Sequence, residues 1–217
     1  MPTLAIIHTT PATVTPLKSL AAEIIPDCDV INFVDDSILP QLARNGGNLT
    51  EVEERLVHYA RFAEQAGADI ILEACSSVGE VVAKMKQAVT IPVVRIDEAM
   101  AEDAVQKGKR LGVAATLRTT LNPTTRLLQS KSDNVEITTK LIDSAYRKLL
   151  EGDQDGHDTV LLDELVELAQ TVDVVVLAQA SMARVVAKMS DDMQGKFLSS
   201  PVMGMERVRE TLLAIEK

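Results

Sequence analysis

The chain contains an internal repeat whose two copies differ at one chemically important position. Residues 68–85 read ADIILEACSSVGEVVAKM, and residues 172–189 read VDVVVLAQASMARVVAKM. An offset of 104 positions aligns Asp69 with Asp173, Cys75 with Gln179, and the shared VVAKM segments. Internal self-similarity of this kind indicates duplicated architecture and constrains the fold more strongly than any single motif. We therefore expect two related halves, with Cys75 and Gln179 at equivalent positions.

The similarity extends to the start of each half. An offset of 107 positions aligns Leu4–His8 with Leu111–Ala115, and also aligns Thr15-Pro16 with Asn122-Pro123. A capping residue followed by proline is typical of a helix start. The repeat therefore predicts that each half begins with a strand, followed by a helix that starts at its proline.

Short apolar runs alternate with amphipathic stretches along the chain, a pattern typical of parallel α/β folds. The expected strands are Thr3–His8, Val30–Val34, Asp69–Glu73, Val93–Ile96, Arg110–Ala115, Val135–Thr138, Asp173–Leu177 and Pro201–Met203. The clearest expected helix is Thr50–Ala66, with a capping box formed by Thr50 and Glu53 and with Gly67 at its end. Its counterpart is Thr159–Gln170, with Asp158 as the cap, preceded by a Gly-rich loop in which His157 is solvated.

This pattern predicts two pseudo-symmetric α/β lobes, each a small parallel sheet of about four strands flanked by helices, with an active-site cleft between them. Residues 1–97 form lobe one and residues 98–205 form lobe two. By symmetry, the C-terminal helix 206–217 is expected to join lobe one.

Composition excludes several classes of function. The net charge of -10 over 217 residues argues against a nucleic-acid partner, which requires clustered Lys and Arg. No apolar run approaches the ~20 residues of a membrane span, and the N-terminus reads as a strand rather than a signal peptide. Two cysteines give neither a disulfide framework nor zinc spacing, so we expect a cytoplasmic protein without a metal.

Cys75 is the first candidate for chemistry. It follows a buried strand, and the carboxyl ends of parallel strands are where ligands bind. A helix starting there would lower the pKa of the thiol from about 8.5 toward neutrality and give a base or nucleophile. Ser76 and Ser77 add hydroxyl donors beside it. The alternative is that Cys75 is a small core residue, as Cys28 is expected to be.

The other strand ends carry further polar candidates. Small hydroxyl residues and backbone donors at several strand ends suit a carboxylate substrate and proton abstraction next to its carboxyl group. These substrate-binding candidates are Thr9, Thr10, Ser76, Ser77, Thr116, Thr119, Gln179, Ala180 and Ser181. Arg118 or Arg184 could hold a second carboxylate, with Arg118 preferred. His8 is either a catalytic acid or a residue that is merely hydrogen-bonded.

These residues resemble the aspartate/glutamate racemase superfamily, which includes hydantoin racemases, maleate isomerases and arylmalonate decarboxylases. Four segments carry the resemblance in order: Thr9–Thr13, Cys75-Ser76-Ser77, Leu111–Thr116 with Thr119-Thr120, and Leu177–Met182. The resemblance implies two homologous lobes, a small carboxylate substrate, no cofactor and a homodimer. It also implies that one cysteine removes the α-proton and that a second returns a proton from the opposite face.

Gln179 stands where the resemblance implies the second cysteine, and a carboxamide has no accessible pKa for proton transfer. We therefore expect one-sided thiol chemistry: stereospecific isomerisation or decarboxylation. A true amino-acid racemase or epimerase is an alternative, with His8 or a water as the second base. A carboxylate-binding protein without catalysis is another.

Overall fold

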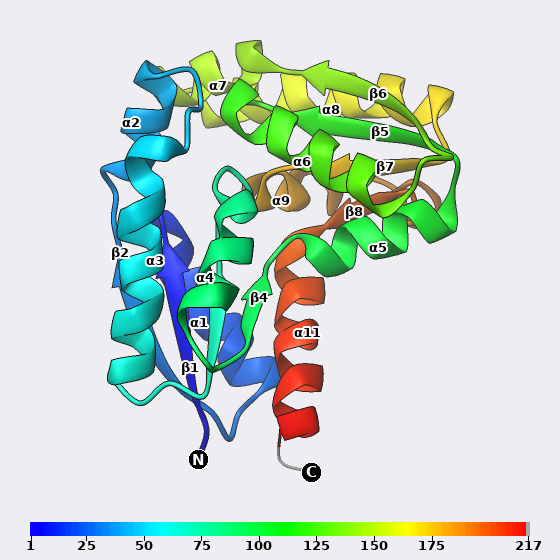
Figure 1. The fold of residues 1–217 in the computed structure, drawn as a ribbon. Helices are drawn as coiled ribbons and strands as arrows, with labels where there is room; N and C mark the ends of the chain where they lie inside the picture. The colour runs from blue at the N-terminus through cyan, green and yellow to red at the C-terminus, as the bar shows by residue number, and fades with distance from the viewer. Residues whose placement is uncertain (216–217) are drawn as a thin grey trace. The chain divides into compact units, whose positions relative to one another are not determined.

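The computed structural model describes residues 1–215, which form two four-stranded parallel sheets flanked by helices (Figure 1). The expected α/β class with two lobes is confirmed. The strands are β1 (Thr3–His8), β2 (Asp29–Val34), β3 (Ile70–Glu73), β4 (Val93–Arg95), β5 (Arg110–Ala115), β6 (Glu136–Leu141), β7 (Val174–Leu177) and β8 (Phe197–Ser199). The helices are α1 (Val14–Ile24), α2 (Ile38–Arg44), α3 (Thr50–Gln65), α4 (Val82–Ala88), α5 (Glu98–Lys107), α6 (Arg118–Lys131), α7 (Asp143–Leu150), α8 (Gln154–Thr171), α9 (Ala183–Val186), α10 (Asp191–Gln194) and α11 (Ser200–Ile215), with single 3-10 turns η1 (Pro11–Thr13), η2 (Gly79–Val81) and η3 (Ala180–Met182).

The chain divides into two compact units. The first comprises Met1–Ile96 and the segment from Pro201 onward, and the second comprises Asp97–Ser200. Their sheets have the same strand order, β2-β1-β3-β4 in the first and β6-β5-β7-β8 in the second. The repeat read from the sequence is therefore a repeat of topology, in which β3 and β7 occupy equivalent central positions.

The first sheet is covered on both faces. Alternation along β1 sends Ala5 and Ile7 into a core with α3 and α4, and sends Leu4 and Ile6 into a core on the other face. That second core contains Met205, Val208 and Leu212 of α11 together with residues of α1. Helix α11 is therefore part of the hydrophobic core of the first unit.

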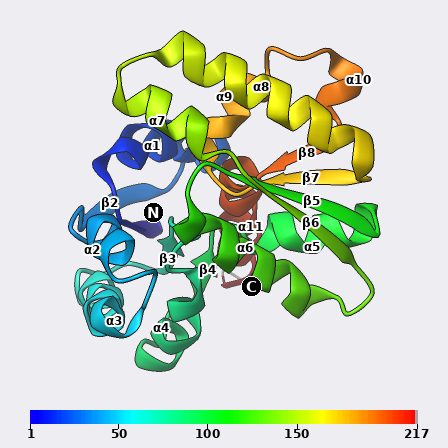
Figure 2. The same cartoon turned by 90° about the horizontal axis from the view of Figure 1, so that it is seen from above.

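The second sheet follows the same plan. Leu161, Leu165 and Leu168 of α8 pack with Val175 and Leu177 of β7 on one face. Helices α5 and α6 contact the sheet from its other face, as Figure 2 shows. The inner strands β1, β3, β5 and β7 are buried on both faces of their sheets, which explains why they read as continuous apolar runs, whereas the edge strands β2 and β6 are partly exposed.

The start of α3 differs from the expected capping box. Helix α3 begins at Thr50, but no side chain caps it in the predicted manner; instead the Thr50 N–H donates to Asn48 Oδ1 at 3.0 Å. Its end agrees with expectation, because Gly67 has φ 86° and its N–H donates to the Glu64 carbonyl. A left-handed glycine after the last helical residue is the usual helix stop.

The start of α8 also differs from expectation. The helix begins at Gln154 rather than Thr159, and its cap is Asp153, whose carboxylate accepts from the Gly156 N–H at 2.8 Å. Gly156 thus lies in the first turn of the helix, because the Asp153 cap satisfies a free N–H there, whereas Gly152, with φ 78°, lies in the turn before it.

The predicted strand Pro201–Met203 is wrong. The eighth strand is β8, which ends at Ser199, and Pro201 lies in the first turn of α11. Proline is favoured at the start of a helix because its missing N–H has no partner there anyway.

The predicted helix start at Asn122-Pro123 is also wrong, because α6 begins at Arg118 and contains Pro123 in its interior. Helix α1 likewise begins at Val14, before Pro16.

No helix among residues 1–215 combines the length and apolar character needed to cross a membrane.

Candidate active site

Cys75 lies just beyond the carboxyl end of β3, one of the two inner strands of the first sheet. The residue is partly exposed, whereas Ser76 and Ser77 are buried. The turn is held by backbone bonds from the Val78 N–H to the Cys75 carbonyl at 3.0 Å and from the Gly79 N–H to the Ser76 carbonyl at 3.4 Å. The predicted Cys-Ser-Ser turn is therefore a hydrogen-bonded connection at the carboxyl edge of the sheet.

Three groups near the Cys75 sulfur stabilise its thiolate form. They are the hydroxyl of Thr9 and both the backbone N–H and the hydroxyl of Ser77. The Thr9 side chain comes from the end of β1 and is almost fully buried, and its hydroxyl makes no hydrogen bond of full geometry within residues 1–215. A buried hydroxyl left for the sulfur is more consistent with a reacting thiol than with a passive core cysteine.

The expected lowering of the Cys75 pKa is wrong. Burial of the thiol, and then the negative charge of Glu73, raise the pKa of Cys75 to about 11 against the partial relief from Thr9 and Ser77. The reason is local: the turn leads into η2 and the short α4, so no long helix starts at the sulfur. At neutral pH the group is a thiol.

Sequence reasoning missed Glu73, the last residue of β3. Its side chain is fully buried, and its Oε1 accepts the Cys75 N–H at 2.7 Å. The signal was present in the repeat, because the aligned residue of the second copy is Leu177. A buried acid in an otherwise apolar strand is unusual unless it has a specific task.

His8 does not share the face of the sheet on which Cys75 packs. Cys75 packs against the core that contains Ala5 and Ile7, whereas β-strand alternation places His8 on the opposite face. The ring is fully buried, with Nδ1 2.8 Å from Thr13 Oγ1 and Nε2 2.9 Å from Asn32 Oδ1.

Burial lowers the pKa of His8 despite its hydrogen bond to Asn32, which favours the neutral ring. Both ring nitrogens are occupied by protein groups, which favours an anchoring role for His8. Thr10 also has a local role, because its hydroxyl accepts from the Ala12 N–H at 3.4 Å and caps η1.

Gln179 occupies the equivalent turn of the second unit, just beyond β7. Its Oε1 accepts two hydrogen bonds from Thr116, one from the backbone N–H at 2.6 Å and one from the hydroxyl at 3.0 Å. Thr116 follows β5 as Thr9 follows β1, so the Thr116–Gln179 contact is the counterpart of the Thr9–Cys75 contact. With its carbonyl fixed in this way, the Gln179 side chain presents its NH₂ group as a donor.

The remaining candidates of the second unit surround this turn in sequence. Arg118 is exposed at the start of α6 and makes no ion pair with another residue of 1–215, and Thr119 beside it is half-buried. Ala180 and Ser181 are exposed in η3. Arg118 therefore keeps its charge available, as a carboxylate-binding residue requires.

Arg184 is instead committed to an internal ion cluster. Both of its terminal nitrogens donate to the Asp158 carboxylate, at 2.8 and 2.5 Å, and Lys188 Nζ donates to the same group at 2.6 Å. His157 Nδ1 lies 2.8 Å from Asp158 Oδ1 and donates to it. His157 is almost completely buried, so its expected solvation is wrong, as is the expected capping role of Asp158.

This cluster has a simpler counterpart in the first unit. Lys84 of α4 pairs with Glu53 of α3, just as Lys188, 104 positions later, pairs with Asp158 of α8. In both units the pair ties the segment after the turn to the long helix that covers the sheet. Arg184 and His157 strengthen this tie, and we assign the cluster a structural role.

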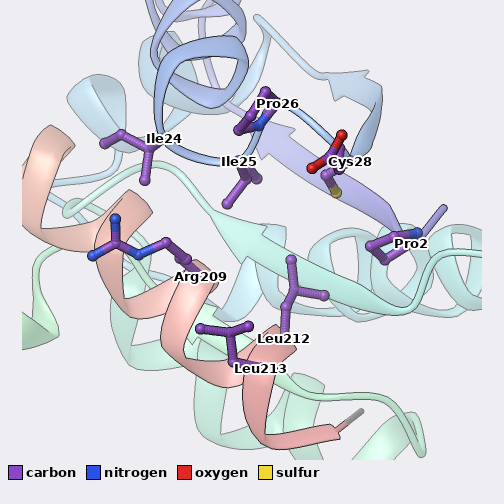
Figure 3. Close-up of a pocket in the computed structure, with 9 residues that line it drawn as sticks. Pro2, Ile24, Ile25, Pro26, Cys28, Arg209, Leu212 and Leu213 are labelled. Atoms are coloured by element: carbon purple, nitrogen blue, oxygen red, sulfur yellow. The ribbon is translucent and has the colours of Figure 1, made fainter.

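A hollow in the first unit lies away from the Cys75 turn. It has a volume of about 290 Å³ and is lined mainly by apolar side chains near Cys28 and the amino end of β1 (Figure 3). Burial raises the pKa of Cys28, whose Sγ donates to the Asp29 carbonyl at 3.5 Å. Among residues 1–215, no hydroxyl group stabilises the Cys28 thiolate as Thr9 and Ser77 do that of Cys75, which favours a structural role for Cys28.

Within residues 1–215, no three His, Cys, Asp or Glu side chains are grouped as metal ligands. The donor set at the Cys75 turn, a thiol with hydroxyl and amide groups, suits an anionic organic ligand.

Comparison with known proteins places this arrangement in context. The model of the Asp/Glu/hydantoin racemase family matches residues 6–208. A crystal structure of a putative Asp/Glu racemase from Yersinia pestis is 17% identical and has a TM-score of 0.76, covering 98% of this chain and 100% of that one. Glutamate racemase from Francisella tularensis in complex with D-glutamate is also 17% identical, with a TM-score of 0.77 and coverage of 99% and 82%.

A glycine-to-cysteine mutant of arylmalonate decarboxylase has the same fold, with 15% identity, a TM-score of 0.63 and coverage of 97% and 93%. No curated protein matches the sequence significantly. At these identities the structural matches establish the fold, and the family model establishes membership.

Proposed function

Because the chain belongs to the Asp/Glu/hydantoin racemase family, we propose that it is a cofactor-independent enzyme in which the Cys75 thiol transfers a proton on a small carboxylate. The observation that carries the proposal is the asymmetry of the repeat. One turn holds a thiol among groups that stabilise a thiolate, and the equivalent turn holds a carboxamide fixed by Thr116. The proposed chemistry is one-sided: stereospecific isomerisation or decarboxylation.

Because its pKa is raised, Cys75 is protonated at neutral pH, and this favours Cys75 as a proton donor over Cys75 as a base. In the proposed step the S–H bond breaks and its proton moves to the α-carbon of an enediolate, whose electron pair forms the new C–H bond. The resulting thiolate is stabilised by the Thr9 hydroxyl and by the N–H and hydroxyl of Ser77. A solvent proton then regenerates the thiol. Decarboxylation supplies such an enediolate without a base, since the carbon–carbon bonding pair stays on the α-carbon as CO₂ leaves.

Substrate binding is assigned to side chains that donate hydrogen bonds. Gln179 offers its NH₂ group and Arg118 a free guanidinium, both suited to carboxylate oxygens. Ser76, Thr119 and Ser181 complete the proposed set with hydroxyl groups. Hydrogen bonds to developing negative charge are among the largest contributions to catalysis.

Among the alternatives, racemisation with His8 as second base has no support in its geometry, because both ring nitrogens are engaged. A carboxylate-binding protein without catalysis would use the same donors but would leave the Thr9 and Ser77 groups around the sulfur without a purpose.

The proposal is tested by a substrate screen in D₂O. Wild type and Cys75→Ser are incubated with both enantiomers of aspartate and glutamate, hydantoins and substituted malonates, and the products are followed by NMR and chiral chromatography. We expect wild type to incorporate one deuterium at the α-carbon of a single enantiomer, and Cys75→Ser to fail. Tight binding of a carboxylate in calorimetry without deuterium incorporation would favour the binding-protein alternative. Complete loss of optical activity would favour a true racemase.

A further inference from the structure

The two copies of the repeat differ at four linked positions rather than one. An offset of 104 aligns Glu73, Cys75, Gly79 and Arg95 of the first unit with Leu177, Gln179, Ala183 and Ser199 of the second. Strand register supports this alignment independently. Glu73 is paired with Ile7 and Arg95, and Leu177 is paired with Ala114 and Ser199, in sheets of identical order.

The four residues of the first unit form one physical group. Glu73 and Arg95 are register partners on neighbouring strands, so their side chains emerge on the same face of the sheet. Both are buried, at 0% and 7% exposure. Glu73 reaches forward to the Cys75 N–H, with Oε1 at 2.7 Å.

Gly79 belongs to the group because of its missing side chain. A Cβ at this position would lie 2.3 Å from Nε and 2.5 Å from Cζ of Arg95. The Arg95 guanidinium therefore lies across the turn that follows Cys75, and a side chain at position 79 would force this guanidinium to move. In the second unit the arginine is replaced by Ser199 and the glycine by Ala183, as this relation requires.

We infer that Glu73 and Arg95 are a pair of positioning residues dedicated to Cys75: both fix the thiol turn, and the Glu73 carboxylate also holds the sulfur in its S–H form, ready to donate a proton. This inference rests on the proposed function of Cys75. It explains why an acid and a base are buried in the lobe that carries the thiol, and why hydrocarbon and hydroxyl side chains replace them in the lobe that carries the amide. Buried ionised residues are costly to keep, so their joint occurrence with the thiol indicates a task.

The direction of the effect follows from charge. A carboxylate beside the sulfur disfavours a second negative charge, and it acts together with burial of the thiol in raising the pKa of Cys75. An uncharged amide at position 73 keeps an oxygen acceptor for the Cys75 N–H but removes the repulsion. Glu73→Gln thus separates the charge of Glu73 from its hydrogen bond.

The experiment measures the rate of iodoacetamide alkylation of Cys75 against pH, in a Cys28→Ser background. We expect the midpoint of thiolate formation to lie near pH 11 with Glu73, and to fall by about one unit or more in Glu73→Gln, since a like charge commonly shifts a pKa by that amount. Glu80→Gln, which changes an exposed acid on the same turn, is the matched control and should leave the midpoint in place. An unchanged midpoint in Glu73→Gln overturns the inference.

A second set of variants guards against a failure to fold. The triple variant Glu73→Leu/Gly79→Ala/Arg95→Ser copies the second unit and removes both buried charges together. We expect it to fold and to show a lowered alkylation midpoint, whereas Gly79→Ala alone should lower thermal stability because Arg95 remains. If Gly79→Ala is equally well tolerated with and without Arg95, the four residues are not coupled and the inference fails.

This readout needs no substrate, so it is independent of the proposed reaction. A lowered midpoint in Glu73→Gln together with full activity in Cys75→Ser would reject the proposed function while preserving the link between Glu73 and the thiol. An unchanged midpoint together with inactive Cys75→Ser would reject the link between Glu73 and the thiol while preserving the proposed function.

Discussion

Thr116 donates two hydrogen bonds to one atom of Gln179, its side-chain Oε1, from the backbone N–H at 2.6 Å and from the hydroxyl at 3.0 Å. The contact has a counterpart in the other unit, where the Thr9 hydroxyl stabilises the thiolate of Cys75. The equivalent turn of the second unit thus has a similar arrangement of donors, although the residue that accepts from them there is a neutral amide.

Replacing Gln179 by cysteine is therefore predicted to restore an acid/base group on the second side. Thr116 would supply the same two donors to the new thiolate, and a thiol can carry a proton whereas a carboxamide cannot. The expected product of Gln179→Cys is a mixture of enantiomers where wild type gives one, as measured by chiral chromatography. Gln179→Ser has the small side chain without the acidic thiol and should retain a single enantiomer; a racemic product from it would contradict the assignment.

Removing the Thr9 hydroxyl is predicted to slow proton transfer. Thr9→Val keeps the shape of the side chain but deletes a hydrogen bond to a charged group, which is typically worth about 1.5–3 kcal/mol. We expect kcat to fall by about tenfold or more, with a smaller effect on KM, in steady-state assays on the identified substrate. Thr10→Val, one position along the chain, is the control and should leave kcat near the wild-type value.

The His8 ring is predicted to make stability depend on pH. Its pKa is lowered in the folded state, so the unfolded chain binds a proton more readily and the free energy of unfolding decreases as the pH falls below about 6.5. Urea denaturation at several pH values should show a weaker decrease for His8→Gln than for wild type over this range. Identical slopes for the two proteins would mean that His8 is not buried as a neutral ring.

Asp158 is predicted to stabilise the second unit through its ion cluster. Burial alone would raise the pKa of Asp158, but hydrogen bonds from Lys188, His157 and Arg184 outweigh it and lower the pKa well below the usual range. The stabilisation is therefore present above about pH 4, the pKa of an unfolded aspartate, and is lost as the pH falls toward the folded value.

We expect Asp158→Asn to lower the free energy of unfolding at pH 7 by about 1–3 kcal/mol. This is less than the loss for a fully buried pair, since Arg184 and Lys188 are 43% and 56% exposed. Asp163→Asn changes an exposed acid on the same helix and should shift stability by less than about 0.5 kcal/mol. Equal stability of the two variants in thermal or urea unfolding would show that the cluster does not hold α9 to α8.

Much of the fold could be predicted because it depends on local patterns. The apolar runs of β1 and β5 predicted the first and last residues of both strands correctly. Gly67 correctly indicated the end of α3, because a left-handed backbone position favours glycine. The predictions at Pro123 and Pro201 were wrong, because a proline alone does not show whether a helix starts before it, at it, or not at all.

The candidate site was harder to predict because electrostatics depends on packing. Sequence reasoning located the Cys75 turn but assigned the wrong direction to the pKa shift, since the depth of burial of the thiol and of the Glu73 carboxylate is not visible in one dimension. Arg184 contacts Asp158 and His157, which lie 26 and 27 positions before it in the sequence, and no local pattern predicts such contacts. The comparison of Glu73 with Leu177 was available from the repeat and would have identified the buried acid.

The central claim is that the thiol of Cys75 transfers the proton, and a matched pair of cysteine variants tests it most directly. The measurement is the initial rate of deuterium incorporation at the α-carbon of the identified substrate by Cys75→Ser and by Cys28→Ser, with folding verified by circular dichroism. The account predicts wild-type rates for Cys28→Ser and a loss of about 10²-fold or more for Cys75→Ser, the usual contribution of a general acid or base. A folded Cys75→Ser protein that incorporates deuterium as fast as Cys28→Ser would contradict it.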